Sequence, residues 1–242
     1  MKLRFSGIAA VAAACVGLSG VAAAETANRI LKDDGPGMHI LPANGPGEFA
    51  WSGLYAGVSL GAGWGESSQN YDRAGNHGAA TLEPAGGAAS ITAGYNWMIG
   101  GNWVAGVEGD LGIMNVSQGA TTMFDGHVWS TSYGPLWGTM RGRAGYLLGD
   151  DLLAYAMGGL AVANIDDVSI GNTAGETAIE EGLRLGLALG VGVEYAWTED
   201  WTVKAEFLHM NFSAVDGQSS NAEAYTFDDS VNLLRVGANM RF

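Results

Sequence analysis

The sequence predicts an all-β protein: an eight-stranded antiparallel transmembrane β-barrel with short periplasmic turns and long extracellular loops. Three observations lead to this prediction. Large apolar residues occupy every second position over long stretches, eight such stretches follow one another, and the connections between them alternate between short and long. These features together are typical of outer-membrane barrels, whose strands carry too little hydrophobicity to resemble membrane helices.

The clearest stretch is LRLGLALGVGVEYAW, residues 183–197, in which every odd position is large and apolar. A transmembrane helix needs about 20 consecutive apolar residues, but Arg184 and Glu194 enclose only nine residues. The period of two indicates a strand. Soluble strands usually have about 3 to 10 residues, so this length favours a tilted strand that crosses a membrane and projects beyond it.

The N-terminus reads as a secretory signal peptide over residues 1–24, with a basic start, an apolar core and an Ala-rich cleavage site. A lipoprotein alternative would use Cys15, but Ala12 stands where a larger aliphatic residue is usual. Residues 25–48 contain two GPG elements and no periodicity, which predicts a flexible periplasmic leader. Residues 49–242 are the predicted barrel.

The first four predicted strands are 51–64, 89–99, 102–114 and 136–148. Strands 51–64 and 89–99 alternate apolar or aromatic residues with small and polar ones. Strand 102–114 sets an apolar face against two acids, and strand 136–148 has a polar face with two arginines. Each has the length and the alternation of a membrane-crossing strand.

The last four predicted strands are 152–164, 183–197, 201–212 and 231–242. Residues 152–164 are apolar almost throughout, so the sequence leaves their facing open. The other three set an aliphatic and aromatic face against one that carries charged residues. A soluble β-sandwich or lipocalin-like barrel would bury the apolar face. Because eight strands enclose room for packed side chains only, the Gly-rich, charged face should point inward and the apolar face should contact lipid.

The inward face should carry a salt-bridged network, because unpaired charges in a low-dielectric interior are costly. Such a network could line a gated or ion-selective pore, or it could be a polar plug that fills the lumen. The second is favoured for eight strands. The predicted interior polar residues are Glu108, Asp110, Arg141, Arg143, Arg184, Glu194, Lys204, Glu206, Arg235 and Arg241.

The formal net charge of −14 argues against nucleic acid as a partner. The four predicted long connections, 65–88, 115–135, 165–182 and 213–230, are rich in Asp and Glu. Such loops could hold divalent cations that bridge to lipopolysaccharide, or they could be a solvated surface. The expected partners are outer-membrane lipid and lipopolysaccharide, and the oligomeric state stays open. The scattered histidines do not suggest haem or a metal, so no cofactor is predicted.

An enzyme of the outer rim is a further alternative, since some small barrels of this membrane carry Ser/His hydrolase sites. His209 and Ser213, near the outer end of strand 201–212, are the candidate pair for a lipid A hydrolase. The sequence marks no third group to orient the imidazole, as such catalysis requires. A non-enzymatic protein is therefore predicted.

The start WSGLYAGVSLGAGWG resembles that of the small porin-like outer-membrane proteins of alphaproteobacteria, as do AGYNWMIGGNWVAGVEGD, GVGVEYAWTEDWTVKAEFLHMNF and the terminal LLRVGANMRF. The resemblance covers about residues 51–242 and implies an OmpA-type barrel in the outer membrane of a Gram-negative cell. It also implies that the barrel-assembly machinery reads the C-terminal Phe242. Members are described as porins, surface antigens, envelope-structural proteins and, in some cases, haemin binders. We therefore expect a structural or surface-interaction role, with a narrow diffusion pore as the alternative.

Overall fold

The computed structural model describes residues 51–73, 76–122, 128–170, 177–219 and 224–242. The predicted signal peptide (1–24) and periplasmic leader (25–48) lie outside the described residues. Within the described ranges, no helix has the length and hydrophobicity that crossing a membrane requires.

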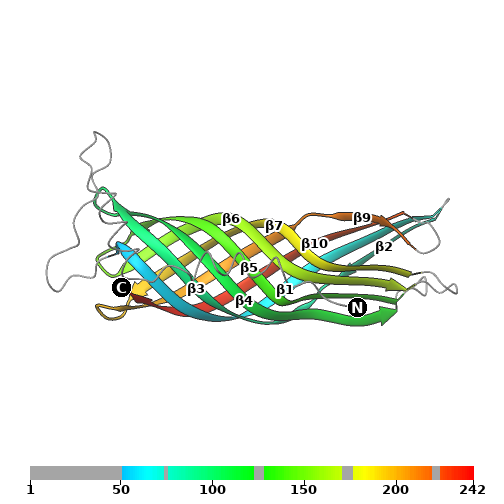
Figure 1. Cartoon of the computed structure of the whole chain (residues 1–242), viewed down its shortest axis with the longest axis horizontal. Helices are drawn as coiled ribbons and strands as arrows, with labels where there is room; N and C mark the ends of the chain where they lie inside the picture. Colours follow the sequence, from blue (N-terminus) through cyan, green and yellow to red (C-terminus); the bar gives the residue numbers. More distant parts are fainter. Residues whose placement is uncertain (1–50, 74–75, 123–127, 171–176, 220–223) are drawn as a thin grey trace, which may run out of the picture.

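Ten antiparallel strand segments form one sheet that closes into a tilted barrel (Figure 1). Along the sheet their order is β2-β1-β3-β4-β5-β6-β7-β8-β10-β9, and pairing of β1 with β10 closes it. The segments are β1 (Gly53–Arg73), β2 (Asn76–Leu82), β3 (Ala85–Ile99), β4 (Trp103–Thr122), β5 (Val128–Leu147), β6 (Leu152–Ile170), β7 (Thr177–Ala196), β8 (Trp201–Phe212), β9 (Val215–Gln218) and β10 (Ala224–Arg241).

These ten segments amount to eight barrel strands, which confirms the predicted fold class. Segments β2 and β3 both pair with β1 and are interrupted only at Glu83 and Pro84. Proline has no N–H to give to the sheet, and its carbonyl instead accepts a hydrogen bond from the backbone of Gly65. Segments β8 and β9 likewise both pair with β10 and are interrupted at residues 213–214.

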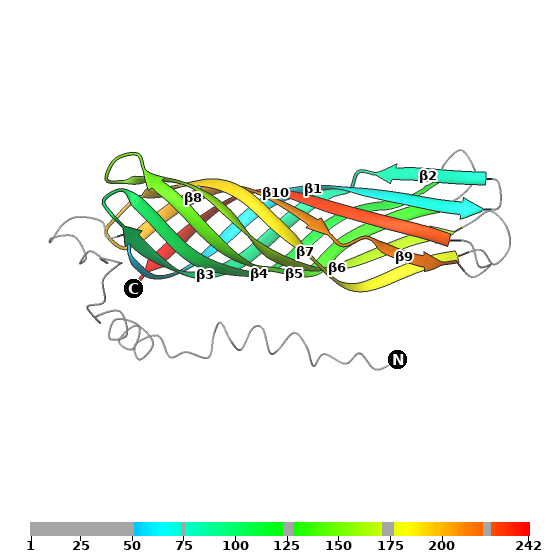
Figure 2. The same cartoon turned by 90° about the horizontal axis from the view of Figure 1, so that it is seen from above.

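Short turns join the strands at the end where the C-terminus lies (Figure 2). Residues 100–102 form the turn between the paired residues Ile99 and Trp103. Gly100 and Gly101 in this turn have φ angles of 57° and 72°, left-handed values that glycine adopts without steric cost. Between β7 and β8, the Thr198 hydroxyl accepts a hydrogen bond from the backbone N–H of Trp201 at 3.1 Å. These are the connections predicted to be short and periplasmic.

The register gives the barrel its stagger. Hydrogen-bonded partners followed from Trp64 once around the barrel arrive at Leu54, ten positions earlier on the same strand. A shear of this size with eight strands requires strongly tilted strands and leaves an interior that side chains can fill.

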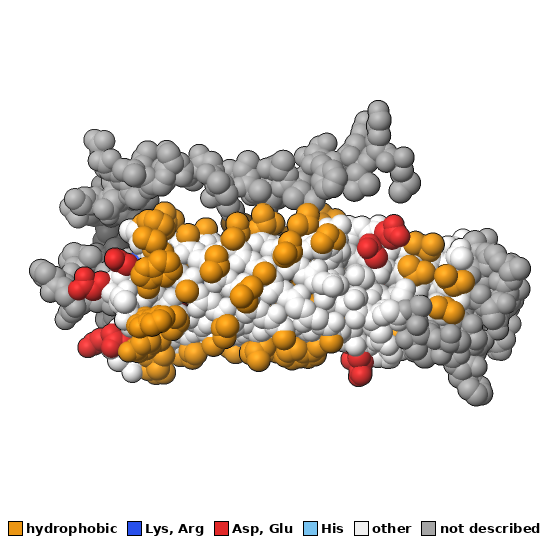
Figure 3. Space-filling model, turned by 90° about the horizontal axis from the view of Figure 1, so that it is seen from below, with side chains coloured by type: hydrophobic (Ala, Val, Ile, Leu, Met, Phe, Trp, Pro, Cys, Tyr) orange, Lys and Arg blue, Asp and Glu red, His pale blue; other side chains and the backbone are white. Residues whose placement is uncertain are grey.

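The apolar face points outward, as predicted, and forms a band around the barrel (Figure 3). On β7 the odd-numbered residues from Ile179 to Tyr195 are exposed, while Arg184, Ala188 and Glu194 are buried. Strand β6, whose facing was open, buries Leu153 and Tyr155 and exposes Leu160. Trp103 and Tyr146 meet edge to face, 5.2 Å apart, at the periplasmic border of the band, where aromatic residues usually mark the membrane interface.

The strands run further outward than predicted. Much of the expected loops 65–88, 115–135, 165–182 and 213–230 is strand, in segments β1, β2, β4 to β7, β9 and β10. Inward positions keep alternating there, but the outward positions become mostly polar, with a few exposed apolar residues such as Ile170 and Ile179. The apolar signal on which the prediction depended is therefore lost.

Beyond the apolar band the barrel wall divides into two separate sheets, here called leaves. We call this part of the barrel the outer head. In the described part of the chain β2 pairs only with β1 and β9 only with β10, so β2-β1-β10-β9 forms one leaf. The outer halves of β4 to β7 form the other leaf. A second apolar core packs between the leaves, and it consists of Ala80, Leu82, Trp129, Ala178, Tyr225 and Phe227.

Candidate functional site

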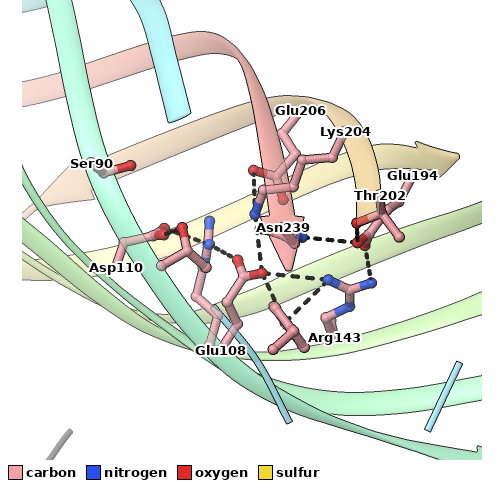
Figure 4. A network of polar contacts seen from close by, with 12 residues as sticks. Ser90, Glu108, Asp110, Arg143, Glu194, Thr202, Lys204, Glu206 and Asn239 are labelled. Carbon is pink, nitrogen blue, oxygen red and sulfur yellow. Dashed lines mark hydrogen bonds and ion pairs between the residues drawn. The ribbon is translucent and has the colours of Figure 1, made fainter. Parts of the chain in front are cut away.

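The lumen holds a dense group of charged side chains at the level of the apolar band. Eight of the ten predicted interior residues meet there, from strands β4, β5, β7, β8 and β10. We call this group the ionic core, and Figure 4 shows most of it. Its members are Glu108, Asp110, Arg141, Arg143, Glu194, Lys204, Glu206 and Arg235, all at most 6% exposed.

Glu108 lies at the centre of the ionic core. Arg141 donates to its Oε1, while Lys204 Nζ and Arg143 Nη1 approach its Oε2 at 3.2 and 3.4 Å. The Tyr55 hydroxyl donates to the same oxygen at 2.9 Å. Several donors on one buried carboxylate can compensate for its removal from water.

Arg235 links two further acids, on the outer side of the core. It reaches Asp110 at 2.9 Å and Glu206 at 2.7 Å. Glu206 also lies 3.3 Å from Lys204 and accepts a hydrogen bond from the Tyr155 hydroxyl at 2.6 Å.

Glu194 lies near the periplasmic end of β7, and Figure 4 shows it beside Arg143 and Thr202. Arg143 donates to it at 2.5 Å, the Thr202 hydroxyl at 2.5 Å and the Asn239 amide at 2.8 Å. Four carboxylates thus face four cations, so the ionic core is neutral as a whole. Such balance is needed for buried charges to be tolerated.

Apolar side chains close the lumen on both sides of the ionic core. On β8 the inward positions Lys204 and Glu206 are followed outward by Leu208, Met210 and Phe212. On the periplasmic side the lumen is closed by a layer of buried residues that includes Trp51, Val104, Leu147, Leu153 and Ala196. The indole of Trp51 donates to the backbone carbonyl of Asp150 at 2.9 Å.

The last two predicted interior residues lie outside the ionic core. Arg241 sits at the periplasmic rim, where it donates to the backbone carbonyl of Ser52. Arg184 lies at the base of the outer head, where it forms ion pairs with Asp167, at 2.7 Å, and with Asp229. We call these two acids the aspartate pair.

The aspartate pair corrects the prediction from the sequence, which placed both acids in long extracellular loops. Asp167 and Asp229 are fully buried on β6 and β10, and the Tyr133 hydroxyl donates to Asp229 at 3.0 Å. The cluster lies beyond the apolar band. Burial and the negative charge of Asp229 raise the pKa of Asp167 to about 7, despite the nearby Arg184. Two carboxylates that share one guanidinium favour retention of a proton.

Several hydroxyl and amide partners of the ionic core were not predicted, among them Tyr55, Tyr155 and Thr202. Each occupies an inward position in the alternation, so the period of two was the available signal. Aromatic residues were expected on the lipid face. These two tyrosines point inward because each lies against a glycine of the neighbouring strand, Gly94 and Gly192.

Comparison with known proteins places this barrel in a family. The model of the "Outer membrane protein beta-barrel domain" matches residues 11–242. The chain belongs to this family. This barrel is therefore an integral outer-membrane protein of the Gram-negative cell envelope, as the sequence predicted.

Its relatives include the "31 kDa outer-membrane immunogenic protein" of Brucella melitensis and of Brucella suis. Each is 27% identical over 80% of this chain and 85% of the relative. Similar solved structures include OprG of Pseudomonas aeruginosa (14% identity, TM-score 0.49, 79% of this chain and 97% of that chain). The outer membrane protease OmpT of Escherichia coli is also similar (11% identity, TM-score 0.48, 78% and 96%). The family match and the immunogenic Brucella relatives support a surface or structural role.

The candidate hydrolase pair is not assembled. His209 faces outward on β8, and its Nδ1 lies 2.9 Å from Asn232 Oδ1 on β10. Asn232 is thus the orienting partner that the sequence did not reveal. Ser213 lies at the break between β8 and β9, where its N–H donates to the Leu185 carbonyl. No hydrogen bond joins the Ser213 hydroxyl to His209 among the described atoms.

Proposed function

We propose that this protein is a closed-lumen structural barrel of the outer membrane that presents its outer head at the cell surface, and that it is neither a diffusion pore nor an enzyme. One observation carries the proposal: the neutral ionic core lies between two apolar layers. Water and ions would have to cross both layers as well as a salt-bridged network that spans the lumen. Each crossing opposes the passage of a charged solute.

The outer head supports the surface role. Two β leaves with their own apolar core extend well beyond the apolar band, and the aspartate pair at their base links strands of both leaves. A rigid projection of this kind suits contact with other molecules outside the cell. The immunogenic Brucella relatives are consistent with an exposed surface.

Planar-bilayer conductance of the purified protein tests the closed lumen. We expect no steady openings from the natural protein. The double variant Lys204→Ala with Glu206→Ala should also stay at baseline conductance, because both apolar layers persist. Steady, ion-selective channels from the natural protein would contradict the proposal and favour a narrow pore.

The non-enzymatic part has its own test. Support comes from the outward His209, which lacks a hydrogen-bonded nucleophile in Ser213. Mass analysis of lipid A from cells with and without the protein should give the same acyl pattern. A missing acyl chain that returns in a Ser213→Ala strain would establish a hydrolase instead.

A further inference from the structure

Two features of the lipid-facing surface lie close together on the side formed by β1, β10, β8 and β7. One is the hydrogen-bonded pair of His209 and Asn232. The other is an apolar groove of about 560 Å³ on the periplasmic side of this pair. Neither feature contributes to the lumen, so the closed-lumen proposal does not explain them.

The polar pair lies at the outer border of the apolar band, with Asn211 and Ser230 at the next outward-facing positions on its outer side. Asn232 is paired in register with Trp64, and His209 with Leu189. The next outward-facing position of β8 toward the periplasm is Phe207, whose ring lies 6.0 Å from that of Trp64. Leu208 and Met210, on either side of His209, are buried, so the imidazole faces the membrane. Polar side chains in contact with lipid are costly and usually serve a function.

The pair keeps hydrogen-bonding capacity after its own contact is made. An amide oxygen only accepts, so the His209 Nδ1–H donates to Asn232 Oδ1. That assignment leaves the lone pair of His209 Nε2 as an acceptor and the two N–H groups of the Asn232 amide as donors. Neither atom bonds another of the described residues. The pair therefore fits a ligand group that both donates and accepts.

The groove has room for hydrocarbon. Its small residues Ala205 and Ala238 lie among larger apolar neighbours such as Leu60, Val236 and Tyr195. Lys204 also borders it, but the Lys204 ammonium points into the lumen. Ala205 is four residues from His209 on the same strand, about 13 Å at roughly 3.3 Å per residue. An acyl chain whose polar end lies at the pair can reach the groove.

We propose that the groove and the His209–Asn232 pair form a binding site for one lipid of the outer leaflet, the lipid anchor of lipopolysaccharide. An acyl chain occupies the groove, and an amide or hydroxyl group near its attached end bonds the pair. Acyl chains of this lipid class carry such groups, which both donate and accept. The ester oxygens of a phospholipid only accept, so they cannot satisfy Nε2. The site depends only on the barrel's location in the membrane, so its failure would leave the closed lumen unaffected.

Native mass spectrometry of the purified full chain, titrated with lipid A or with phosphatidylcholine in detergent, tests the site, because phosphatidylcholine has no N–H or O–H group. We expect saturable one-to-one binding of lipid A and weaker binding of phosphatidylcholine. The double variant His209→Leu with Asn232→Leu should bind lipid A about tenfold more weakly, the effect of one or two lost hydrogen bonds. Ala205→Phe, which fills the groove, should weaken it similarly.

Matched controls keep the test specific. Ala156→Phe adds the same ring at an exposed position of β6 outside the groove, and Asn115→Leu removes an exposed amide on β4. Both should bind lipid A as the natural protein does, and heat-modifiable migration on gels checks that every variant is folded. Equal binding of both lipids, or unchanged binding by both site variants, would overturn the proposal. So would a dimer that Ala205→Phe abolishes without any effect on lipid binding.

Discussion

Lys204 and Glu108 meet across the full width of the lumen, with Nζ and Oε2 3.2 Å apart. Their strands, β8 and β4, are four positions apart among eight and therefore face each other. A contact between opposite walls leaves little space for a continuous channel at this level. It also makes the ionic core a brace that holds the barrel's cross-section.

Lys204→Met should destabilise the barrel by about 3–5 kcal/mol, because Glu108 and Glu206 would lose a cation while remaining buried. Urea unfolding in detergent, followed by tryptophan fluorescence, measures this loss. Adding Glu206→Gln restores the balance of charges, so the double variant should be more stable than Lys204→Met alone. The exposed change Glu66→Gln should fall within about 0.5 kcal/mol of the natural protein. A double variant with fully additive losses would contradict the charge-balance argument.

Gly94→Ala should disturb the ionic core through Tyr55. A Cβ at this position would lie 2.3 Å from the Tyr55 hydroxyl oxygen, which donates to Glu108. Displacement of the ring should cost about 1–3 kcal/mol, as overpacking does. Gly87→Ala on the same strand is the matched control, because its Cβ would meet nothing closer than 3.8 Å. Equal unfolding midpoints for the two variants in urea would show that the tyrosine does not depend on this glycine.

The sequence predicted the part of the barrel that lies in the membrane, because lipid imposes apolar residues at alternate positions there. It did not predict the outer head, where the outward positions no longer form an apolar row and the inward positions mix apolar with charged residues. Asp167 and Asp229 were therefore assigned to loops, although they occupy inward positions. The partners of each charge could not be predicted either. Contacts such as Lys204 with Glu108 depend on the shear and on strands far apart in sequence.

The outer head should lose stability as the pH rises toward 7. The pKa of Asp167 is about 7 in the folded protein against an ordinary value of 3.8, so between these values the folded state binds more protons than the unfolded state. Stability therefore falls with rising pH in this window and is constant above it. Hydrogen exchange of the outer strands, corrected for intrinsic pH dependence, should show about tenfold or greater loss of protection between pH 5 and pH 8.

Asp167→Asn provides the control for this pH dependence. The amide oxygen can still accept from Thr131, which now donates to Asp167 at 2.6 Å, but the side chain no longer titrates. Protection in this variant should be nearly independent of pH, whereas the exposed change Asp228→Asn should leave the natural profile unchanged. A pH dependence that persists in Asp167→Asn would assign the effect to another group.

Phe242→Ala should slow assembly in cells without weakening the assembled barrel. The Phe242 backbone N–H donates to the Leu54 carbonyl, and the substitution keeps this hydrogen bond. The residue is 71% exposed and contributes little to the core. We propose that the barrel-assembly machinery reads this exposed aromatic terminus. The fraction of heat-modifiable protein in isolated membranes should therefore fall in the variant. After refolding in detergent, its urea midpoint should match that of the natural protein. Similar losses in both measurements would mean that Phe242 supports the fold and not its assembly.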